Sequence, residues 1–285
     1  RAGGVCEAKR RMLCTRNKIL VFRVRVCLCE GMTERETKNA ALLYGFHAVR
    51  QAWLNPERRC TRLLLTDNGE QLFSPVLQEA ERQGVTRRPQ PQLAPREQLD
   101  RMLPGAVHQG IVLDARPLPD TALEDVLRAA EIRPAACVVV LDQVTDPHNI
   151  GAILRSAAAF GALALVLPDR SAPPVGGVLA KTASGAVDVV PIVRVTNLSR
   201  ALDQLRKGGF WTIGFAESGK ETLAALDLSG KVALVLGAEG EGLRRLTMER
   251  CDLIARLPTV PPIGSLNVSN AAAVALYEVA RRTAS

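Results

Sequence analysis

Hydrophobic positions from residue 40 onward follow strand and helix spacings in turn. In the second half of the chain, apolar runs of strand length fall at 136–141, 162–167, 189–195, 210–216, 232–237 and 253–257. Helical patterns fall between most of them, near 149–159, 175–183, 198–208 and 242–250, and a small-residue helix is expected over 268–282. Strands rich in valine and leucine that alternate with helices predict a parallel sheet covered on both faces.

The residues before this region predict a smaller α/β unit. An amphipathic helix is expected from Ala41 to Ala52, ending near Asn55 because the residue before a proline disfavours the helical region. Strands are expected at 61–66 and 110–114, and helices at 72–83 and 96–103. Prolines bracket a helical stretch at 123–130, which indicates a connection that would permit domain movement. We therefore predict an extension over 1–39, a small domain over 40–116, a linker over 117–135 and a larger domain over 136–285.

Composition limits the class of protein. With 47% hydrophobic and 23% charged residues among 285, the chain is too apolar to be disordered. Its apolar runs are far shorter than the roughly 18 residues of a membrane-spanning helix, which excludes a transmembrane protein. The seven cysteines lack paired CxxC spacing and indicate reduced thiols in a cytoplasmic protein. With only three histidines and no His/Cys cluster, no metal is predicted.

The formal net charge of +8 is concentrated in the first 31 residues. They hold eight lysines and arginines against two acidic residues, and the rest of the chain is nearly balanced. Overall basicity is therefore weak evidence for RNA binding. The segment 1–31 is consistent with a basic arm, a transit peptide or a start assigned upstream of Met32. Its composition favours the last, and we leave it out of fold reasoning.

An open α/β sheet suggests a nucleotide site at the carboxyl ends of its strands, but the dinucleotide fingerprint is missing. The segment from Asp142 to Gly151, which follows the first strand of the larger domain, contains no G-x-G-x-x-G. The glycines cluster after a late strand instead, as Gly237-Ala238-Glu239-Gly240-Glu241-Gly242. A Rossmann oxidoreductase is therefore disfavoured, and nicotinamide binding would revive it.

Three polar segments follow predicted strands. Asn149 and Arg155 share a helix, where the guanidinium suits a phosphate, although a helix cap and a surface ion pair are ordinary alternatives. Glu239 lies between glycines that let the backbone approach a ligand, or that merely form a tight turn. Ser265 and Asn267 end a prolyl loop at a helix N-terminus, where either could simply be the cap.

These segments, in this order, resemble the three motifs of the SpoU class of RNA 2′-O-methyltransferases in the knotted SPOUT superfamily. The matching residues are Asn149-x-Gly151-x-x-x-Arg155-Ser156, Leu236-Gly237-x-Glu239-Gly240-x-Gly242 and Ser265-Leu266-Asn267-Val268-Ser269. Further stretches are similar to the bacterial 23S rRNA guanosine 2′-O-methyltransferase branch, namely Tyr44-Gly45-x-His47-Ala48-Val49, His108-Gln109-Gly110 and Asp169-Arg170-Ser171-Ala172. The resemblance covers nearly everything after residue 40.

The resemblance implies a trefoil-knotted methyltransferase domain preceded by a small ribosomal-protein-like RNA-binding domain. It also implies a homodimer joined through the knot region and the last helix, acting on RNA without a DNA or membrane partner. The implied contacts to S-adenosylmethionine are Gly237, Ala238, Gly240, Leu257, Pro258 and Leu266. The implied polar residues around the transferred methyl and the target ribose are Asn149, Arg155, Glu239, Ser265 and Asn267.

Methyl transfer to a ribose hydroxyl is an in-line displacement that needs alignment and removal of a proton. The family assigns the base role to the counterpart of Arg155, but a guanidinium with a pKa above about 12 is a poor base. We prefer Arg155 as a phosphate clamp and alkoxide stabiliser, positioned by Asn149, Ser265 and Asn267. Glu239 would orient Arg155 or Asn149, and proton acceptance by Glu239 stays open. One departure is Pro261, where relatives usually carry glycine, because proline removes an amide N–H that the cofactor loop could use.

RNA binding by the small domain would need a local basic patch, because residues 40–135 hold twelve basic and twelve acidic side chains. The candidates are Arg58-Arg59 with Arg62, and Arg87-Arg88. The low aromatic content favours recognition of folded RNA over single strands. The predicted function is 2′-O-methylation of a guanosine in 23S rRNA, with a tRNA substrate or a non-catalytic RNA-binding factor as alternatives.

Overall fold

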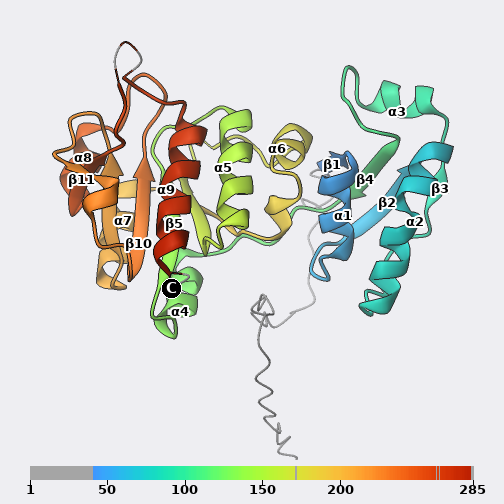
Figure 1. Ribbon diagram of the computed structural model, residues 1–285. Helices are drawn as coiled ribbons and strands as arrows, with labels where there is room; N and C mark the ends of the chain where they lie inside the picture. The colour runs from blue at the N-terminus through green and yellow to red at the C-terminus, as the bar shows by residue number, and fades with distance from the viewer. Residues whose placement is uncertain (1–40, 171, 261, 263, 284–285) are drawn as a thin grey trace, which may run out of the picture. The chain divides into compact units, whose positions relative to one another are not determined.

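The structure is a computed structural model that describes residues 41–170, 172–260, 262 and 264–283. The expectations for the extension 1–39 and for Pro261 lie outside these residues. The described residues form a four-stranded and a seven-stranded sheet, both with helices packed on them (Figure 1). The predicted α/β class, with a small domain before a parallel-sheet domain, is confirmed.

The seven-stranded sheet has the strand order β7-β6-β5-β10-β8-β11-β9, and every neighbouring pair is parallel. Its strands are β5 (Ala136–Leu141), β6 (Ala164–Pro168), β7 (Ile192–Val195), β8 (Trp211–Phe215), β9 (Glu221–Thr222), β10 (Lys231–Leu236) and β11 (Leu253–Arg256). All six predicted strands are present, and the parallel arrangement is as predicted. Strand β9 has only two residues, too few to leave a hydrophobic pattern in the sequence.

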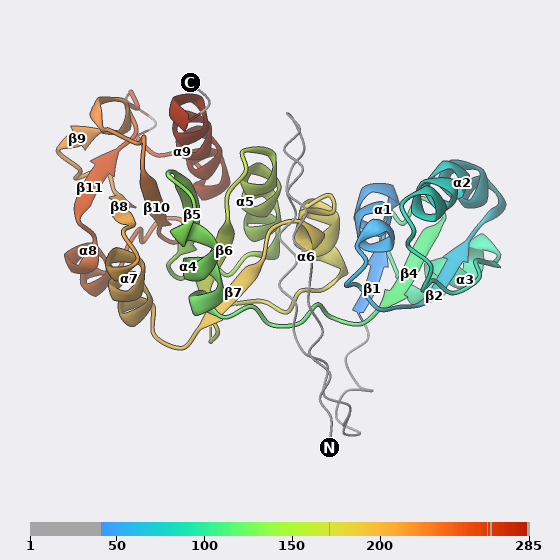
Figure 2. The same cartoon turned by 90° about the horizontal axis from the view of Figure 1, so that it is seen from below.

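Both faces of this sheet are buried. Figure 2 shows one layer of helices with α5 (Pro147–Ala159) and α9 (Val268–Thr283), and an opposite layer with α4 (Leu123–Glu131), α7 (Leu198–Lys207) and α8 (Arg245–Arg250). Side chains of β5 alternate between two core clusters, one holding Val139 and the other Val140. Helix α4 falls in the predicted linker, yet its apolar face is buried in the second cluster. This helix therefore packs with the larger domain.

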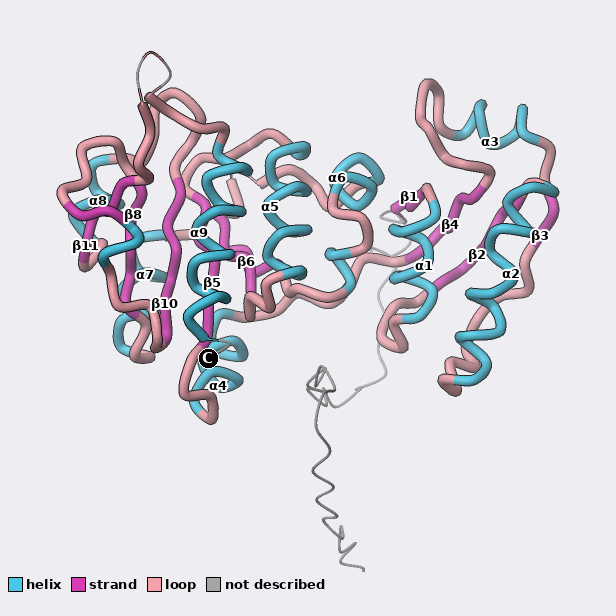
Figure 3. Tube along the Cα trace, viewed as in Figure 1, coloured by secondary structure: helices cyan, strands magenta, loops and turns pink. Residues whose placement is uncertain are grey.

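The four-stranded sheet has the order β1-β4-β2-β3, with β4 antiparallel to both β1 and β2 and β3 parallel to β2. Its elements are β1 (Ala41–Tyr44), α1 (Phe46–Leu54), β2 (Cys60–Leu65), α2 (Asp67–Arg82), β3 (Gln92–Leu93), α3 (Arg96–Met102) and β4 (Ile111–Ala115) (Figure 3). The helix predicted from Ala41 was wrong at its start, since residues 41–44 pair with β4 as a strand. Gly45, with φ of 85°, separates that strand from α1.

Between β6 and β7 lie α6 (Gly177–Thr182) and the 3-10 helix η2 (Ala186–Asp188), and a second 3-10 helix, η3 (Leu223–Ala225), follows β9. Elements α6 and η2 contact β1 and α1 of the small domain. Val49 and Trp53 share one buried cluster with Ala183 and Val187. The core is therefore continuous between the two sheets, although the proline-bracketed connection predicted freedom of movement. No described helix combines the length and the apolar character needed to cross a membrane.

Candidate active site

The first feature of the site is a triangle of polar side chains from the three predicted motifs. The Nδ2 atom of Asn267 donates to Oδ1 of Asn149 at 3.1 Å and to Oε1 of Glu239 at 3.4 Å. The Nδ2 atom of Asn149 donates to Oε2 of Glu239 at 3.4 Å. Residues far apart in the sequence thus meet at one edge, because β5 and β10 are parallel neighbours whose carboxyl ends coincide.

The two amides are held in fixed orientations by helix starts. Asp146, rather than Asn149, caps α5, and its side chain accepts a hydrogen bond from the His148 N–H at 2.9 Å. Asn149 in the first turn is therefore free to face Glu239. Asn267 uses its Oδ1 to accept from the backbone N–H and the hydroxyl of Ser269, at 2.9 and 2.6 Å, at the start of α9. Its Nδ2 is left for the triangle, so the capping and the site interpretations of Asn267 both apply.

The glycine segment after β10 is a closed turn that presents Glu239. Ala238 and Gly242 exchange backbone hydrogen bonds of 3.1 and 2.9 Å. A Cβ atom at Gly237 would lie 2.0 Å from the carbonyl carbon of Gly242, so only glycine fits there. Gly240 and Gly242 have φ of 83° and 68°, which other residues rarely adopt. The glycines predicted to let the backbone approach a ligand are thus also required by the turn itself.

A buried carboxylate anchors the far end of this turn. Asp142, directly after β5, is fully buried and accepts from the backbone N–H of Arg244 at 3.1 Å and from its Nε at 2.8 Å. Its own N–H donates to the carbonyl of Leu236 at 2.8 Å. Sequence reasoning gave Asp142 no role. An acidic residue directly after a fully apolar strand was a signal that could have been used. Nothing in the sequence indicates that its partner is Arg244, which lies 102 residues away.

Arg155 and Ser265 do not join the triangle. Six residues after Asn149 on α5, Arg155 lies about 9 Å further along the helix and roughly 120° around it. It is exposed and lines an open groove of about 400 Å³ with polar residues of α1 and the turn before η2, including His47, Gln51 and Ser184. Ser265 is exposed and precedes Asn267 by two residues in the sequence. In the described part of the chain, no hydrogen bond joins Arg155 or Ser265 to Asn149, Glu239 or Asn267.

The predicted cofactor contacts follow strands that share this edge. Gly237, Ala238 and Gly240 follow β10, and Leu257 and Pro258 follow β11, with β8 as the one strand between. Leu257 is partly buried against the core, whereas Pro258 and Leu266 are exposed. Nothing lies within 4 Å of a Cβ placed on Gly240 or Gly242. Open backbone beside exposed apolar side chains fits a cofactor held by main-chain groups and apolar walls.

Metal ligands are not part of this arrangement, since the described residues contain no group of three or more His, Cys, Asp or Glu side chains that could hold an ion. The described cysteines, Cys60, Cys137 and Cys251, are free thiols. Burial raises the pKa of Cys60 to about 11 and the pKa of Cys137 to about 12. These thiols therefore stay protonated near neutral pH and are poor nucleophiles.

Two of the arginines expected to contact phosphates have structural roles instead. Arg58 is 3% exposed and its guanidinium is paired with Asp188. Arg88 donates to the carbonyls of Trp53 and Asn55, each at 2.7 Å. The prediction for Arg58 and Arg88 was wrong, because charge in the sequence does not reveal which guanidinium groups are used inside the protein. Arg87 is exposed, and Arg62 lies 3.7 Å from Asp114 in a partly exposed pair.

The parallel sheet defines an α/β protein, in which a ligand site is expected at the carboxyl ends of the strands, where the polar cluster lies. Comparison with known proteins specifies the class. Residues 136–277 match the SpoU rRNA Methylase family, and residues 42–121 match the RNA 2'-O ribose methyltransferase substrate binding family. The chain belongs to the SpoU rRNA methylase family, and the resemblance seen in its motifs is confirmed.

Named relatives are similar over nearly their whole length. The chain is 40% identical over 243 residues to the 23S rRNA (guanosine-2'-O-)-methyltransferase RlmB of Pasteurella multocida, covering 84% of this chain and 97% of that protein. It is 39% identical over 246 residues to RlmB of Escherichia coli K12, covering 85% and 98%. The structure of the SpoU methyltransferase AviRb from Streptomyces viridochromogenes, in complex with the cofactor AdoMet, has a TM-score of 0.70 at 25% identity, covering 90% of this chain and 95% of that one.

Proposed function

We propose that this protein transfers a methyl group from S-adenosylmethionine to the ribose 2′-hydroxyl of a guanosine in 23S rRNA. The observation that carries the proposal is the triangle of Asn149, Glu239 and Asn267, which unites the three motifs at the carboxyl edge of the sheet. The substrate follows the relatives, which act on 23S rRNA guanosine and match nearly end to end. The cofactor follows the AdoMet complex of a family member with the same fold.

In this proposal the chain binds, orients and deprotonates, and the bound cofactor supplies an electrophilic methyl group. Main-chain groups of Gly237, Ala238 and Gly240, with apolar surface from Leu257, Pro258 and Leu266, hold the cofactor. Asn149 and Asn267 orient the ribose, since their amides are fixed by α5 and α9. Because both oxygens of Glu239 face these two amides, Glu239 orients Asn149 rather than Arg155. Glu239, the carboxylate of the triangle, is also the candidate acceptor of the hydroxyl proton.

Arg155 and Ser265 complete the proposed site on the RNA side. The exposed guanidinium of Arg155 clamps a phosphate and stabilises the developing alkoxide once RNA is bound. Ser265, exposed in the loop before Asn267, positions the same ribose. The RNA phosphates are therefore proposed to pass over the groove that Arg155 lines.

The proposal includes a knotted fold, a homodimer and the domain limits 40–116, 117–135 and 136–285. The dimer is supported by α9, on which Val274 and Tyr277 are large apolar side chains that remain 47% and 55% exposed. They lie three residues apart and so share one face of α9, on which a second copy of the chain would pack. Light scattering coupled to size exclusion should give twice the chain mass, and a monomeric mass at micromolar concentration would contradict the dimer.

The experiment is methyl transfer by the purified protein with S-adenosylmethionine and transcribed 23S rRNA that carries no modification. The expected product is 2′-O-methylguanosine at one position, with no product from an Asn149→Ala variant that still binds the cofactor. Transfer to tRNA instead of 23S rRNA would retain the chemistry and change the substrate. Cofactor binding without transfer to either RNA would favour a non-catalytic RNA-binding factor.

A further inference from the structure

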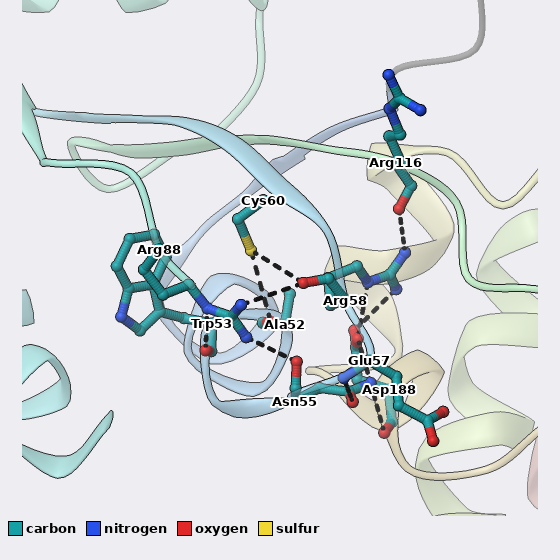
Figure 4. Close-up of polar contacts among 9 residues, drawn as sticks. All are labelled: Ala52, Trp53, Asn55, Glu57, Arg58, Cys60, Arg88, Arg116 and Asp188. Carbon is teal, nitrogen blue, oxygen red and sulfur yellow. Dashed lines mark hydrogen bonds and ion pairs between the residues drawn. The ribbon is translucent and has the colours of Figure 1, made fainter. Parts of the chain in front are cut away.

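A buried ion pair joins the small domain to the parallel-sheet domain. Nε of Arg58 donates to Oδ1 of Asp188 at 2.8 Å, and Nη2 donates to Oδ2 at 3.0 Å (Figure 4). Both side chains are 3% exposed. Asn55 adds a donor to Oδ1 of Asp188 at 3.1 Å, and Nη1 of Arg58 donates to the carbonyl of Arg116 at 3.0 Å. The carboxylate of Asp188, in η2, thus accepts hydrogen bonds from two side chains of the segment between α1 and β2.

The loop that carries Arg58 is itself fixed. The guanidinium of Arg88 lies 5.7 Å from the centre of the Trp53 ring and donates to the Trp53 and Asn55 carbonyls at 2.7 Å each. Its Nη1 also donates to the carbonyl of Arg58 at 3.2 Å. Figure 4 shows these groups around one loop. Arg58 therefore meets Asp188 with a backbone that is already held in place.

Glycines make the rest of this contact too close for other residues. A Cβ atom at Gly177 of α6 would lie 2.5 Å from the Tyr44 ring. A Cβ atom at Gly185, which has φ of 90°, would lie 2.5 Å from Cγ of Gln51. Lys181 lies 5.3 Å from the centre of the Tyr44 ring and donates to the Val107 carbonyl. Residues 177–188, here called the docking segment, thus contact the small domain at Gly177, Lys181, Gly185 and Asp188.

In some proteins a buried ion pair specifies a geometry more than it adds stability. Two charges removed from water are tolerated only when they meet with good geometry, and loss of one partner leaves a buried charge without compensation. Arg58 and Asp188 therefore favour one arrangement of the two domains over shifted ones. Helix η2 packs against α5, the helix that carries Asn149 and Arg155. The small domain is therefore held at a fixed position relative to these two residues.

We propose that the docking segment holds the small domain in one fixed position, and that Arg58 and Asp188 are positioning residues that determine which nucleotide of a bound RNA reaches the Asn149 triangle. The inference rests on the proposed function. RNA held by the small domain is presented at a set distance from the methylation site. The device acts on RNA placement and leaves the cofactor site unchanged.

The test compares Asp188→Asn and Arg58→Gln with the double variant Arg58→Met/Asp188→Leu, in the full chain. Each single variant should raise KM for 23S rRNA on the order of tenfold and spread methylation to neighbouring nucleotides. The Kd for S-adenosylmethionine should not change. The double variant should regain stability but still methylate neighbouring nucleotides, because an apolar pair restores a packed contact without fixing one geometry. Arg206→Gln, in the partly exposed pair with Asp203, is the matched control and should behave as wild type.

Hydrogen–deuterium exchange separates this inference from the proposed function. In the single variants, amides of α1 and α6 should exchange faster while β5 and β10 keep their protection. If a single variant does not fold, Lys181→Met replaces it, because Lys181 also joins the docking segment to the small domain. The same exchange at α1 and α6 is then compared with wild type. Folded variants with wild-type KM, one methylated nucleotide and unchanged exchange at α1 and α6 would overturn the inference. Wild-type protein that transfers no methyl group contradicts the proposed function instead, and the exchange result then still decides whether the domains are docked.

Discussion

The two ends of helix α5 differ sharply, although one sequence motif spans both. At its start, Asn149 is surrounded by partners from the other two motifs, Glu239 and Asn267. Near its end, Arg155 is exposed and faces a groove shared with α1 of the small domain. Two residues of one sequence motif thus lie in different parts of the structure, Asn149 in the triangle and Arg155 in the groove.

This difference separates what the single chain completes from what it leaves to a ligand. The triangle is held by hydrogen bonds within the protein and needs no added molecule to form. Arg155 has a charge, an open approach and no such fixed partner among the described residues, which suits a group that receives RNA. We therefore regard the first end of α5 as preorganised and the second as completed by the substrate.

The largest effect is expected from Gly237→Ala, which changes the turn that presents Glu239 to Asn149. The added methyl would lie 2.0 Å from the Gly242 carbonyl carbon, so the turn that presents Glu239 cannot keep its shape. Calorimetry should detect no S-adenosylmethionine binding. Gly230→Ala is the matched control, since nothing lies within 4 Å of its Cβ position, and it should bind normally. Normal binding by Gly237→Ala would break the assignment of this turn to the cofactor.

Arg155→Ala should reduce kcat about 10²- to 10³-fold, the usual cost of losing one group that stabilises developing charge. The Kd for S-adenosylmethionine should stay at the wild-type value, because Arg155 is not at the cofactor loops. Arg245→Ala, at an exposed arginine on α8, controls for loss of a positive charge. An equal loss of turnover and cofactor affinity in Arg155→Ala would remove the distinction between the two ends of α5.

Double-mutant cycles sharpen the comparison with a smaller effect. Asn149 and Asn267 are hydrogen bonded at 3.1 Å, so their alanine substitutions should couple by about 1 kcal/mol in the activation free energy. Asn149 and Arg155 share no hydrogen bond, so the coupling between their alanine substitutions should be smaller, within about 0.5 kcal/mol. Single-turnover rates of the four variants in each cycle measure both values. Strong coupling between Asn149 and Arg155 alone would show that they act as one unit.

The smallest effect concerns two thiols of the parallel-sheet domain, the buried Cys137 and the partly buried Cys251. Burial raises the pKa of Cys137 from 9.0 to about 12, and that of Cys251 to about 12, so folded thiols stay protonated where unfolded ones ionise. Their contribution to stability is complete below pH 9 and is lost as the pH rises toward 12. At pH 8.5, alkylation of both, followed by peptide mass spectrometry, should be at least about a hundredfold slower than in urea. Equal rates would indicate that β5 opens readily.

Much of the fold could be predicted because its signals are local. Six apolar runs gave six strands, and the fixed order of three motifs gave the family. The start of the small domain could not be read in this way, since Ala41–Tyr44 has a helical spacing and becomes a strand only by pairing with β4. Local pattern does not report a partner strand about 70 residues away.

The structure brings some of the predicted site residues together and keeps others apart. Asn149, Glu239 and Asn267 were expected together and lie together. Arg155 was expected with them and lies elsewhere, because six residues along a helix turn a side chain to another face. The pairing of Asp142 with Arg244 and the burial of Arg58 depend on contacts between distant segments, which neither charge nor spacing shows.

The central claim is tested most directly on total RNA from cells that lack this protein. Their total RNA is incubated with the purified protein and S-adenosylmethionine carrying a labelled methyl group, and ribose methylation is then mapped. The account predicts a single new 2′-O-methylguanosine in 23S rRNA, absent when Asn149→Ala replaces the wild type. No labelled ribose in any RNA, from a folded protein that binds the cofactor, would contradict it.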